Sequence, residues 1–347
     1  MNTAIITGVA GQDGMYLARR LLARGWRVVG TTRPGSTSPV RMRPYLRGVD
    51  VVEADLRDTE RFAELVQAHR PEAVFNLAGF SSVGRSWGDP ALVLDTNTTV
   101  VASMLEILLR HRDATGHDVR FFEASSAEIF GSQVSGALDE DAPHRPRTPY
   151  AVAKSATHHL LISYREKYDL FACNGILFNH ESPFRGQQFV AGKIARAAAE
   201  AACGLTPTVT LGDLDVHRDW GAAIDIVEGI RLSLAHDRPM DYVLATGASH
   251  TLRDMIEVAF SSVGIDDPSP YLRLEPGMWP TTQADALLGD ASRARTELGW
   301  TARRSFAELV GDMVHVDLAR LRSGVEEDEG YLLRSELQVP AARAVTL

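Results

Sequence analysis

Residues 3–17 have the sequence TAIITGVAGQDGMYL, and this stretch decides the fold. A short apolar run leads into three glycines spaced by two residues each, and a helical pattern follows. Because glycine has no Cβ, the backbone can turn tightly and approach a pyrophosphate, whose charge then meets free N–H groups and the positive end of a helix dipole. The strand–turn–helix context therefore predicts a dinucleotide site rather than a merely structural turn. The predicted cofactor contacts are Gly8, Gly11, Gln12, Asp13 and Gly14.

The first half of the chain alternates short β-branched runs with longer helical patterns, which is typical of an α/β fold with a doubly wound parallel sheet. Right-handed crossovers between the strands build one twisted sheet. The predicted strands are Ala4–Thr7, Val28–Thr31, Val51–Glu53, Ala73–Asn76, Arg120–Ser125 and Ala172–Leu177. The predicted helices between them include Tyr16–Arg24, Thr59–His69, Leu92–Leu109 and Ala151–Tyr168.

After Asn179 the pattern becomes irregular, which predicts a smaller, discontinuous α/β lobe in the C-terminal half. Helices are expected at about 189–203 and 221–235, and a short strand near 208–211. The expected organisation is a cofactor-binding domain (1–178 plus about 216–240), a substrate lobe (about 179–215 and 241–322) and a solvated tail (323–347).

Composition narrows the possible classes of protein. The chain has 347 residues, 45% hydrophobic and 23% charged, which suffices for a sizeable core without disulfides or metals. A net charge of -9 argues against general nucleic-acid binding, which needs a basic footprint. Cys173 and Cys203 lack metal-ligand spacing and are expected to be reduced. Without an export signal or about 18 uninterrupted apolar residues, we expect a cytoplasmic protein with no membrane span and no metal site.

The end of the second predicted strand indicates which cofactor binds. An NAD site usually has Asp or Glu about twenty residues after the turn, for the ribose diol. Here Gly30 is followed by Thr31, Thr32 and Arg33, and an arginine can pair with a 2′-phosphate, so NADP is favoured over NAD. Asp55 is a candidate contact for the adenine amine, with helix capping as the alternative. The predicted cofactor site is also lined by Leu56, Leu77 and Ala78.

Tyr150 and Lys154 lie one helical turn apart, so both side chains can face one site. A nearby cation stabilises a phenolate, which makes a phenol a usable base near neutral pH. The phenolate can take the proton from a sugar hydroxyl while hydride leaves the same carbon for the nicotinamide. The alternative is a Tyr and a Lys on a solvated helix face. We favour the catalytic interpretation because chance predicts only about 0.07 such pairs here, from eight Tyr and three Lys in 347 residues.

The fifth predicted strand ends in Ala124, Ser125 and Ser126, at the edge where parallel sheets place their ligands. Ser126 can donate to the reacting oxygen or simply satisfy the strand end. Glu128 indicates a second proton transfer, because oxidation of an alcohol needs no carboxylate there. Once a sugar C4 is a ketone, a carboxylate can remove the acidified C5 proton as the C6 hydroxyl departs. The alternative for Glu128 is a surface acid.

These residues together resemble the extended short-chain dehydrogenase/reductase superfamily, and the second half narrows this to the GDP-mannose 4,6-dehydratase family. The resemblance spans nearly the whole chain. Its most specific stretches are Gly8–Leu17, Ser126–Gly131, Thr148–Lys154, Asn174–Pro183 and Leu211–Gly221. It implies an NADP-dependent lyase with a Rossmann domain, in which Ser126, Glu128, Tyr150 and Lys154 are catalytic.

The resemblance also implies the contacts of the substrate and of the far end of the cofactor. Asn179, Lys193 and Arg218 are similar to residues that hold a nucleotide diphosphate, and Leu211 and Gly212 lie in the same substrate region. His180, Glu181 and Arg185 are similar to residues around the nicotinamide and phosphates. A nucleotide-sugar substrate follows, with a GDP-hexose favoured, together with a homo-oligomer, either a dimer or a tetramer.

Three positions depart from the family pattern. Ala127 stands where the family has a hydroxyl or carboxylate that assists departure of the C6 hydroxyl, so Glu128 must act alone. Residues Trp279–Asp285 lack the Arg and Glu that contact the nucleotide in the family. Arg33-Pro34 replaces an arginine pair, which weakens the case for a cofactor-bridged tetramer.

Three functions are compatible with these residues. The leading hypothesis is dehydration of GDP-mannose to its 4-keto-6-deoxy form. The second is an NDP-sugar 4-epimerase, because Ser125-Ser126-Ala127 also resembles that related group and epimerisation needs no Glu128. The third is a non-catalytic NADP-binding regulatory protein, against which the intact Ser126, Tyr150 and Lys154 count.

Overall fold

A seven-stranded sheet forms the centre of the molecule in the computed structural model, which describes residues 1–131, 136–275 and 286–332. The strand order is β11-β6-β5-β4-β1-β2-β3, and every pairing is parallel. The strands are β1 (Thr3–Thr7), β2 (Arg27–Thr32), β3 (Val49–Glu53), β4 (Ala73–Asn76), β5 (Arg120–Ala124), β6 (Ala172–Leu177) and β11 (Tyr242–Leu244). The order reverses between β1 and β4, and such a switch point places ligands outside the carboxyl ends of the strands. The predicted fold class and its six strands are confirmed.

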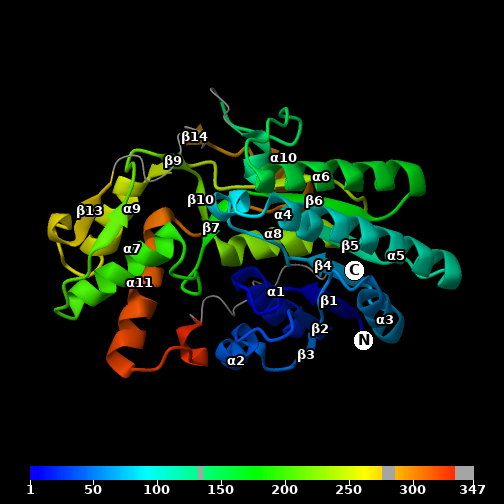
Figure 1. Ribbon diagram of the computed structural model, residues 1–347, viewed down its shortest axis with the longest axis horizontal. Helices are drawn as coiled ribbons and strands as arrows, with labels where there is room; N and C mark the ends of the chain where they lie inside the picture. The colour runs from blue at the N-terminus through cyan, green and yellow to red at the C-terminus, as the bar shows by residue number, and fades with distance from the viewer. Residues whose placement is uncertain (132–135, 276–285, 333–347) are drawn as a thin grey trace.

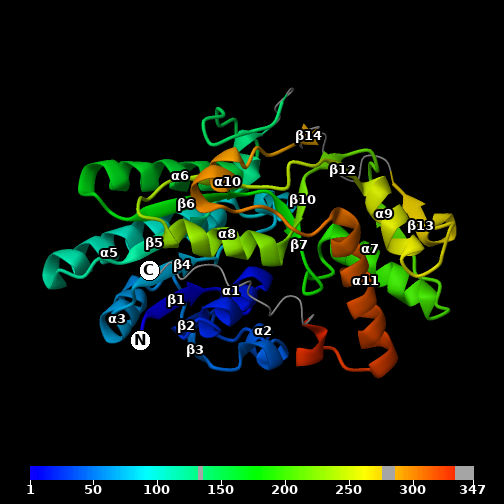
Figure 2. The same ribbon diagram turned by 180° about the vertical axis from the view of Figure 1, so that it is seen from behind.

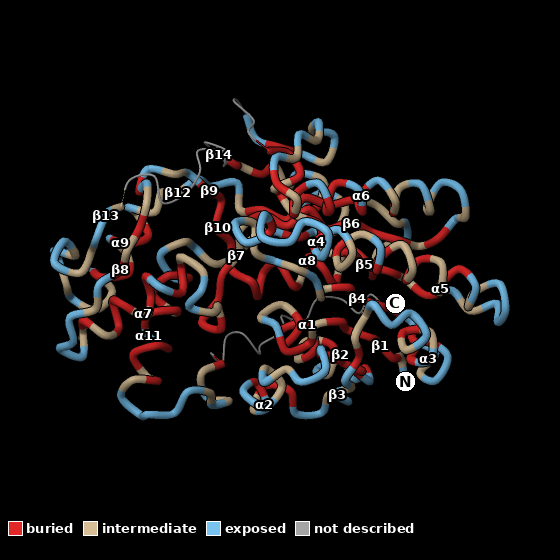
Figure 3. The backbone as a smooth tube through the Cα atoms, in the orientation of Figure 1, coloured by how far each residue is buried: buried red, intermediate tan, exposed pale blue. Residues whose placement is uncertain are grey.

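Helices cover both faces of the sheet, as Figure 1 shows. One face carries α1 (Gln12–Leu22) and α8 (Ala223–Ala235), which pack on each other, and Figure 2 shows this side. The other face carries α3 (Thr59–His69), α5 (Val100–Thr115) and α6 (Pro149–Tyr168). The strands between these layers are largely buried in Figure 3. This two-sided cover explains the near-continuous apolar sequence of β1 and β4.

The helix predicted at Leu92–Leu109 is three consecutive segments: α4 (Pro90–Leu94), a π-helical turn η3 (Asp95–Thr99) and α5. The whole stretch Pro90–Thr115 is long and apolar enough to cross a membrane, and 44% of its most apolar window is buried. The apolar residues of α5 pack into the core beside α3, with Met104, Leu105 and Leu108 fully covered. This packing gives the apolar composition a role in the core.

The second lobe lies at one end of the molecule and is built around α7 (Val190–Ala202), α9 (Leu252–Ser261) and α11 (Phe306–Ser323) (Figure 1). Short strand pairs attach to these helices. They are β7 (Asn179–Glu181) with β10 (Trp220–Ala222), β8 (Val209–Leu211) with β13 (Leu272–Leu274), and β9 (His217–Arg218) with β12 (His250–Thr251) and β14 (Ala286–Leu287). The remaining segments are α2 (Ser38–Arg41), η1 (Arg43–Leu46), η2 (Gly84–Trp87), η4 (Ala127–Phe130), η5 (Ser269–Tyr271), α10 (Ser292–Leu298) and η6 (Glu329–Tyr331).

The predicted lobe boundary at residue 240 is corrected by β11. This strand pairs in parallel with β6, through Tyr242 opposite Gly175 and Leu244 opposite Leu177. All three of its residues are buried. The chain therefore returns to the central sheet after α8 before it continues into the second lobe.

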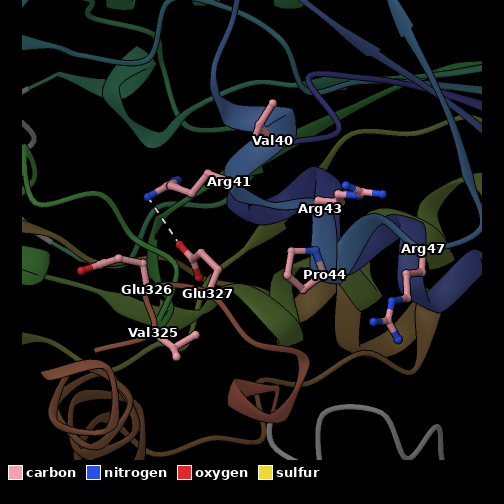
Figure 4. A pocket seen from close by; sticks show the side chains of 8 residues that line it. All are labelled: Val40, Arg41, Arg43, Pro44, Arg47, Val325, Glu326 and Glu327. Atoms are coloured by element: carbon pink, nitrogen blue, oxygen red, sulfur yellow. Dashed lines mark ion pairs between the residues drawn. The ribbon is translucent and has the colours of Figure 1, made fainter. Parts of the chain in front are cut away.

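The tail was predicted to be solvated from Ser323 onward, and this is wrong for its first part. Glu327 accepts hydrogen bonds from Tyr45 and Arg320 at 2.9 Å each, and Arg41 lies 3.6 Å from its other oxygen. Glu329 pairs with both Arg19 and Arg47. Figure 4 shows the pocket where this segment meets α2 and η1. We call Arg41, Tyr45, Arg320, Glu327 and Glu329 the C-terminal clasp; residues 333–347 lie outside the described part of the chain.

Candidate active site

The glycine-rich turn joins β1 to α1 with a geometry that demands glycine. Gly8 has φ of 70°, and its N–H donates to the carbonyl oxygen of Thr31 at 3.0 Å. A Cβ at Gly14 would lie 2.5 Å from the carbonyl oxygen of Gly8. The N–H of Gly11 donates to that same oxygen at 2.9 Å. The turn therefore brings the amino end of α1 to the carboxyl end of the sheet, with its first-turn N–H groups available to an anion.

Buried polar atoms at this edge fit a polar ligand. Oδ1 of Asp13, Oγ1 of Thr32 and Oγ of Ser125 are buried and have no hydrogen-bond partner among the described residues. Asp13 and Ser125 come after β1 and β5, and Thr32 is the last residue of β2, so all three lie at the carboxyl edge of the sheet. A buried polar atom without a partner carries a desolvation cost that a ligand hydrogen bond removes. Together with the glycine turn, this pattern fits a dinucleotide.

The segment that contains His180 is attached directly to the glycine-rich turn. Nε2 of His180 lies 3.0 Å from Oδ2 of Asp13. Gln12 donates to the carbonyl oxygen of His180 at 3.0 Å and accepts from Ser182 at 2.8 Å. Although burial lowers the pKa of His180, the Asp13 carboxylate raises it above its ordinary value overall. Nδ1 of His180 also faces the carbonyl oxygen of Phe178 at 2.7 Å, so both ring nitrogens face acceptors, which is the pattern that suits a protonated imidazole.

Arg33 and Asp55 lie in different environments at the ends of β2 and β3. Arg33 is exposed, and its guanidinium makes no hydrogen bond or ion pair with the described residues. Asp55 binds the side chain of Arg57 at 2.6 and 3.1 Å. The capping alternative for Asp55 is wrong, because the N-cap of α3 is Asp58, which accepts from the N–H of Arg61 at 3.1 Å.

The predicted lining residues after β3 and β4 have different surroundings. Leu56 packs against the core beneath α3 and α5. Leu77 and Ala78 donate their N–H groups to Oγ1 of Thr7, each at 3.0 Å. The backbone that follows β4 is therefore tied to the end of β1, and the Cα of Ala78 would lie 3.1 Å from a Cβ at Gly8.

Tyr150 and Lys154 lie in the first turns of α6. This helix begins there because Thr148 caps it, with its side chain accepting from the N–H of Ala151 at 3.1 Å, and Pro149 occupies the first turn. Both side chains are largely buried, at 9% and 6% exposed. Lys154 donates to Oε1 of Glu123 at 2.8 Å and to the carbonyl oxygen of Ala124 at 2.6 Å. The ammonium is thus fixed at the carboxyl end of β5.

Ser126 and Glu128 form the turn that follows β5. Oγ of Ser126 accepts from the N–H of Glu128 at 3.2 Å and so caps η4. Burial raises the pKa of Glu128, while the charge of Arg218 acts in the opposite direction. A carboxylate with a raised pKa is a better base for a carbon-bound proton near neutral pH. Ala127 between them is buried and contributes only apolar surface.

The residues assigned to the substrate are spread over several elements of the second lobe. Asn179 lies on β7 opposite Trp220, and Arg218 is buried on the neighbouring β9. Leu211 is buried at the end of β8, and Gly212 follows it. Lys193 on α7 is exposed and makes no side-chain bond with the described residues. Arg185 pairs with Glu181 at 2.8 Å and stacks on the ring of Phe189. Residues Trp279–Asp285 lie outside the described part of the chain.

Three site residues were missed by the sequence analysis. Glu123 is fully buried beside Lys154, and Asn76 donates to it at 2.6 Å. Asn97 in η3 clamps the loop after β4 through the N–H of Phe80 at 2.7 Å. A charged residue inside the apolar strand Arg120–Ala124 was the available signal for Glu123, since charged side chains are buried only when they are paired.

Residues 5–313 match the family model of GDP-mannose 4,6 dehydratase. GDP-mannose 4,6 dehydratase 2 of Arabidopsis thaliana is 38% identical over 95% of this chain and 90% of its own length. The chain belongs to the GDP-mannose 4,6 dehydratase family.

Solved structures agree with the fold of this family. The UDP-glucose 4-epimerase of Thermus thermophilus, solved with NAD, has a TM-score of 0.78 at 26% identity and covers 92% of this chain and 99% of its own. The protein RMD of Pseudomonas aeruginosa, solved with NADPH, has a TM-score of 0.76 at 22% identity and covers 92% and 100%. An epimerase thus shares the fold of a chain in the dehydratase family, so residues within the site must distinguish the reactions.

Proposed function

We propose that this protein dehydrates a nucleotide-linked hexose, GDP-mannose, to its 4-keto-6-deoxy form. The observation that carries the proposal is Glu128, a partly buried carboxylate with a raised pKa, two residues beyond Ser126 at the carboxyl end of β5. Tyr150 and Lys154 begin the helix beside this strand end, and Lys154 is bonded to it. Membership of the dehydratase family supports the same reaction. We call Glu123, Ser126, Glu128, Tyr150 and Lys154 the catalytic edge.

Each residue of the catalytic edge has a defined task in this reaction. Tyr150 takes the proton of the C4 hydroxyl, while Ser126 donates a hydrogen bond to the C4 oxygen. A bound nicotinamide supplies one function, which is to accept the C4 hydride and return it to C6. Glu128 takes the C5 proton and passes it to the departing C6 hydroxyl, which leaves as water. C5 then regains a proton equal to the one lost from the C4 hydroxyl, so the net change is the loss of one water.

We propose NADP as the cofactor. Arg33 follows β2, where an NAD site usually has a carboxylate, and its exposed guanidinium has no partner among the described residues. A 2′-phosphate would satisfy it through charge-assisted hydrogen bonds. Replacing Arg33 with Ala should weaken NADP binding at least tenfold and leave NAD binding unchanged, as measured by quenching of tryptophan fluorescence. Equal weakening of both cofactors would contradict the assignment.

We also propose that the protein assembles as a homo-oligomer. Trp87, Leu92 and Val152 are 57%, 38% and 44% exposed, and they lie on η2, α4 and α6, which contact one another. Exposed apolar side chains on adjoining elements are typical of a surface covered by another subunit. Light scattering with size exclusion tests this: a Trp87→Asp variant should shift toward monomer, and a monomeric wild type would refute the proposal.

The reaction is tested by mass analysis of GDP-mannose after incubation with the protein and NADP. We expect a product lighter by one water, and the same assay with UDP-, CDP- and dTDP-hexoses identifies the nucleotide. In Glu128→Gln the water should be retained while C4 oxidation still occurs, visible as transient absorbance of reduced cofactor. A product of unchanged mass but inverted C4 would instead establish a 4-epimerase. Binding of NADP without conversion of any nucleotide hexose would indicate a non-catalytic protein.

A further inference from the structure

A chain of hydrogen bonds runs through the catalytic edge in one donor–acceptor direction. Oγ1 of Thr7 accepts the N–H groups of Leu77 and Ala78, so its own proton is directed to Oδ1 of Asn76, at 2.6 Å. The oxygen of Asn76 is thereby used as an acceptor. Its Nδ2 group must then donate to Oε2 of Glu123, at 2.6 Å. The backbone N–H groups after β4 thus fix the donor–acceptor orientation of Thr7, Asn76 and Glu123 in this series of hydrogen bonds.

Glu123 receives donors on both of its oxygens. Asn76 donates to one oxygen, and Lys154 donates to the other at 2.8 Å. An ionised carboxylate accepts at both ends, whereas a glutamine would turn its own N–H donor toward Asn76 or Lys154. Burial raises the pKa of Glu123, and the bonds from Lys154 and Asn76 oppose this effect. Asn76, Glu123 and Lys154 are 2%, 0% and 6% exposed, so water does not replace a missing partner. The donor pattern therefore defines a buried pair of carboxylate and ammonium.

The charge of Lys154 follows from the same contacts. Burial lowers the pKa of the ammonium, but the carboxylate of Glu123 outweighs this effect and holds the pKa above its usual value. Tyr150 is the other titratable group that interacts with the ammonium. The side chains that β1, β4 and η3 contribute nearby are Thr7, Asn76 and Asn97, which carry no charge. Tyr150 therefore faces a neutral pair and not an isolated cation.

We propose that Glu123 is a positioning residue for the hydroxyl oxidation: it fixes the Lys154 ammonium and offsets its charge, and so sets the pH dependence of the oxidation. This inference rests on the proposed function. A carboxylate this close to the ammonium weakens the attraction that a phenolate would feel. Strand β5 provides the carboxylate of Glu123 at this position. A neutral amide there would leave the charge of Lys154 without a balancing anion beside Tyr150.

The first test is Glu123→Gln. The midpoint of urea unfolding should fall, because the glutamine amide would face the donor of Asn76. The pH at which the oxidation rate is half-maximal should also move down by about one unit, because a negative charge that opposes the phenolate is removed. Turnover is measured against pH with GDP-mannose and NADP, and unfolding is measured on the protein alone.

The double variant Asn76→Asp with Glu123→Gln is the matched rescue. An aspartate at 76 accepts from Thr7 and from the amide of the new glutamine, whose oxygen accepts from Lys154, so every donor again meets an acceptor. The urea midpoint should recover toward the wild type. The rate profile should stay shifted to lower pH, because the carboxylate at position 76 is separated from Lys154 by the side chain at position 123.

The outcomes separate this inference from the proposed function. A Glu123→Gln variant that is less stable but keeps the wild-type pH profile would show a purely structural glutamate and overturn the inference. An unrescued double variant would overturn the assigned donor direction. If wild-type protein converts no nucleotide hexose, the proposed function and this inference fail together. Normal conversion with an unshifted profile rejects the inference alone.

Discussion

The catalytic edge and the C-terminal clasp each contain a buried glutamate that faces a cation. Glu123 is fully buried beside Lys154, and the side chain of Glu327 is 8% exposed beside Arg320. Both glutamates join segments far apart in sequence: Glu123 lies 31 residues from Lys154, and Glu327, only 7 residues from Arg320, also binds Tyr45, 282 residues away. In this respect the two regions are alike.

They differ in how completely the cation is used. Arg320 donates to Glu327, to Asp317 and to the carbonyl oxygens of Pro183 and Glu326, all within 2.9 Å. Lys154 uses two of its three N–H groups on Glu123 and Ala124 within the described residues. Arg320 thus uses four of its five N–H groups on four residues of the protein, whereas Lys154 makes only two such bonds with the described residues and lies one helical turn from Tyr150. We therefore expect the same chemical pair to stabilise the protein in the clasp and to serve the proposed reaction at the catalytic edge.

The largest expected effect comes from removing one tyrosine hydroxyl from each region. Tyr150→Phe should lower turnover by about 10²–10⁴-fold, because the hydroxyl that moves the substrate proton is lost. Its urea midpoint should stay close to the wild type, since the ring remains. Tyr45→Phe is the matched control: it loses a 2.9 Å bond to Glu327, which should cost about 1.5–3 kcal/mol of unfolding free energy and leave turnover unchanged. Similar activity losses in both variants would remove the distinction between the regions.

Short-range patterns were enough to predict the sheet and the placement of Tyr150 and Lys154 one turn apart on one helix. The glycine turn, the six strands and the one-turn spacing of Tyr150 and Lys154 all depend on residues close in sequence. The seventh strand was missed because Tyr242–Leu244 has three residues, too few for a period to be recognised. Its pairing with β6 is what makes it a strand.

Contacts between distant residues could not be predicted in the same way. Glu123 resembles any charged residue at the end of a strand until Asn76 and Lys154 are brought to it from 47 and 31 residues away. The acidic run of residues 326–329 resembles a solvated tail because several of its cationic partners, Arg19, Arg41 and Arg47, lie near the N-terminus. Charge in a sequence indicates that a partner is needed, but the fold determines which partner is available.

Removing the Arg320 cation from the C-terminal clasp should lower the unfolding free energy without changing turnover. Arg320→Leu leaves Glu327 and Asp317 without their buried partner, and an uncompensated buried charge costs about 3–5 kcal/mol of unfolding free energy. Turnover of the folded protein should remain at the wild-type rate. Arg322→Leu, on an exposed arginine of the same helix, should change the unfolding free energy by about 0.5 kcal/mol or less. A loss below about 1 kcal/mol in Arg320→Leu would show that the clasp contributes little.

Mild acid should lower the unfolding free energy through a histidine on α6, and this effect is the smallest of the three. The clasp contains no histidine, but His158 on α6, one turn beyond Lys154, is buried against Asp241 with Arg165, His144 and His159 nearby. Burial lowers its pKa from 6.5 to about 4, although Asp241 opposes this. The unfolded state therefore binds the proton more readily. The stability that neutral His158 contributes is complete above pH 6.5 and is lost as the pH falls toward about 4.

Urea unfolding at pH 7 and pH 5 measures this effect. Between these values the wild type should lose roughly 2 kcal/mol of unfolding free energy through His158, because its unfolded form protonates while its folded form largely does not. His158→Gln cannot take up the proton, so its loss over the same interval should be smaller by that amount. His159→Gln, at the exposed neighbouring position, should lose as much as the wild type. An equal loss in His158→Gln and wild type would mean that acid destabilises the protein elsewhere, and that α6 is no more acid-sensitive than the clasp.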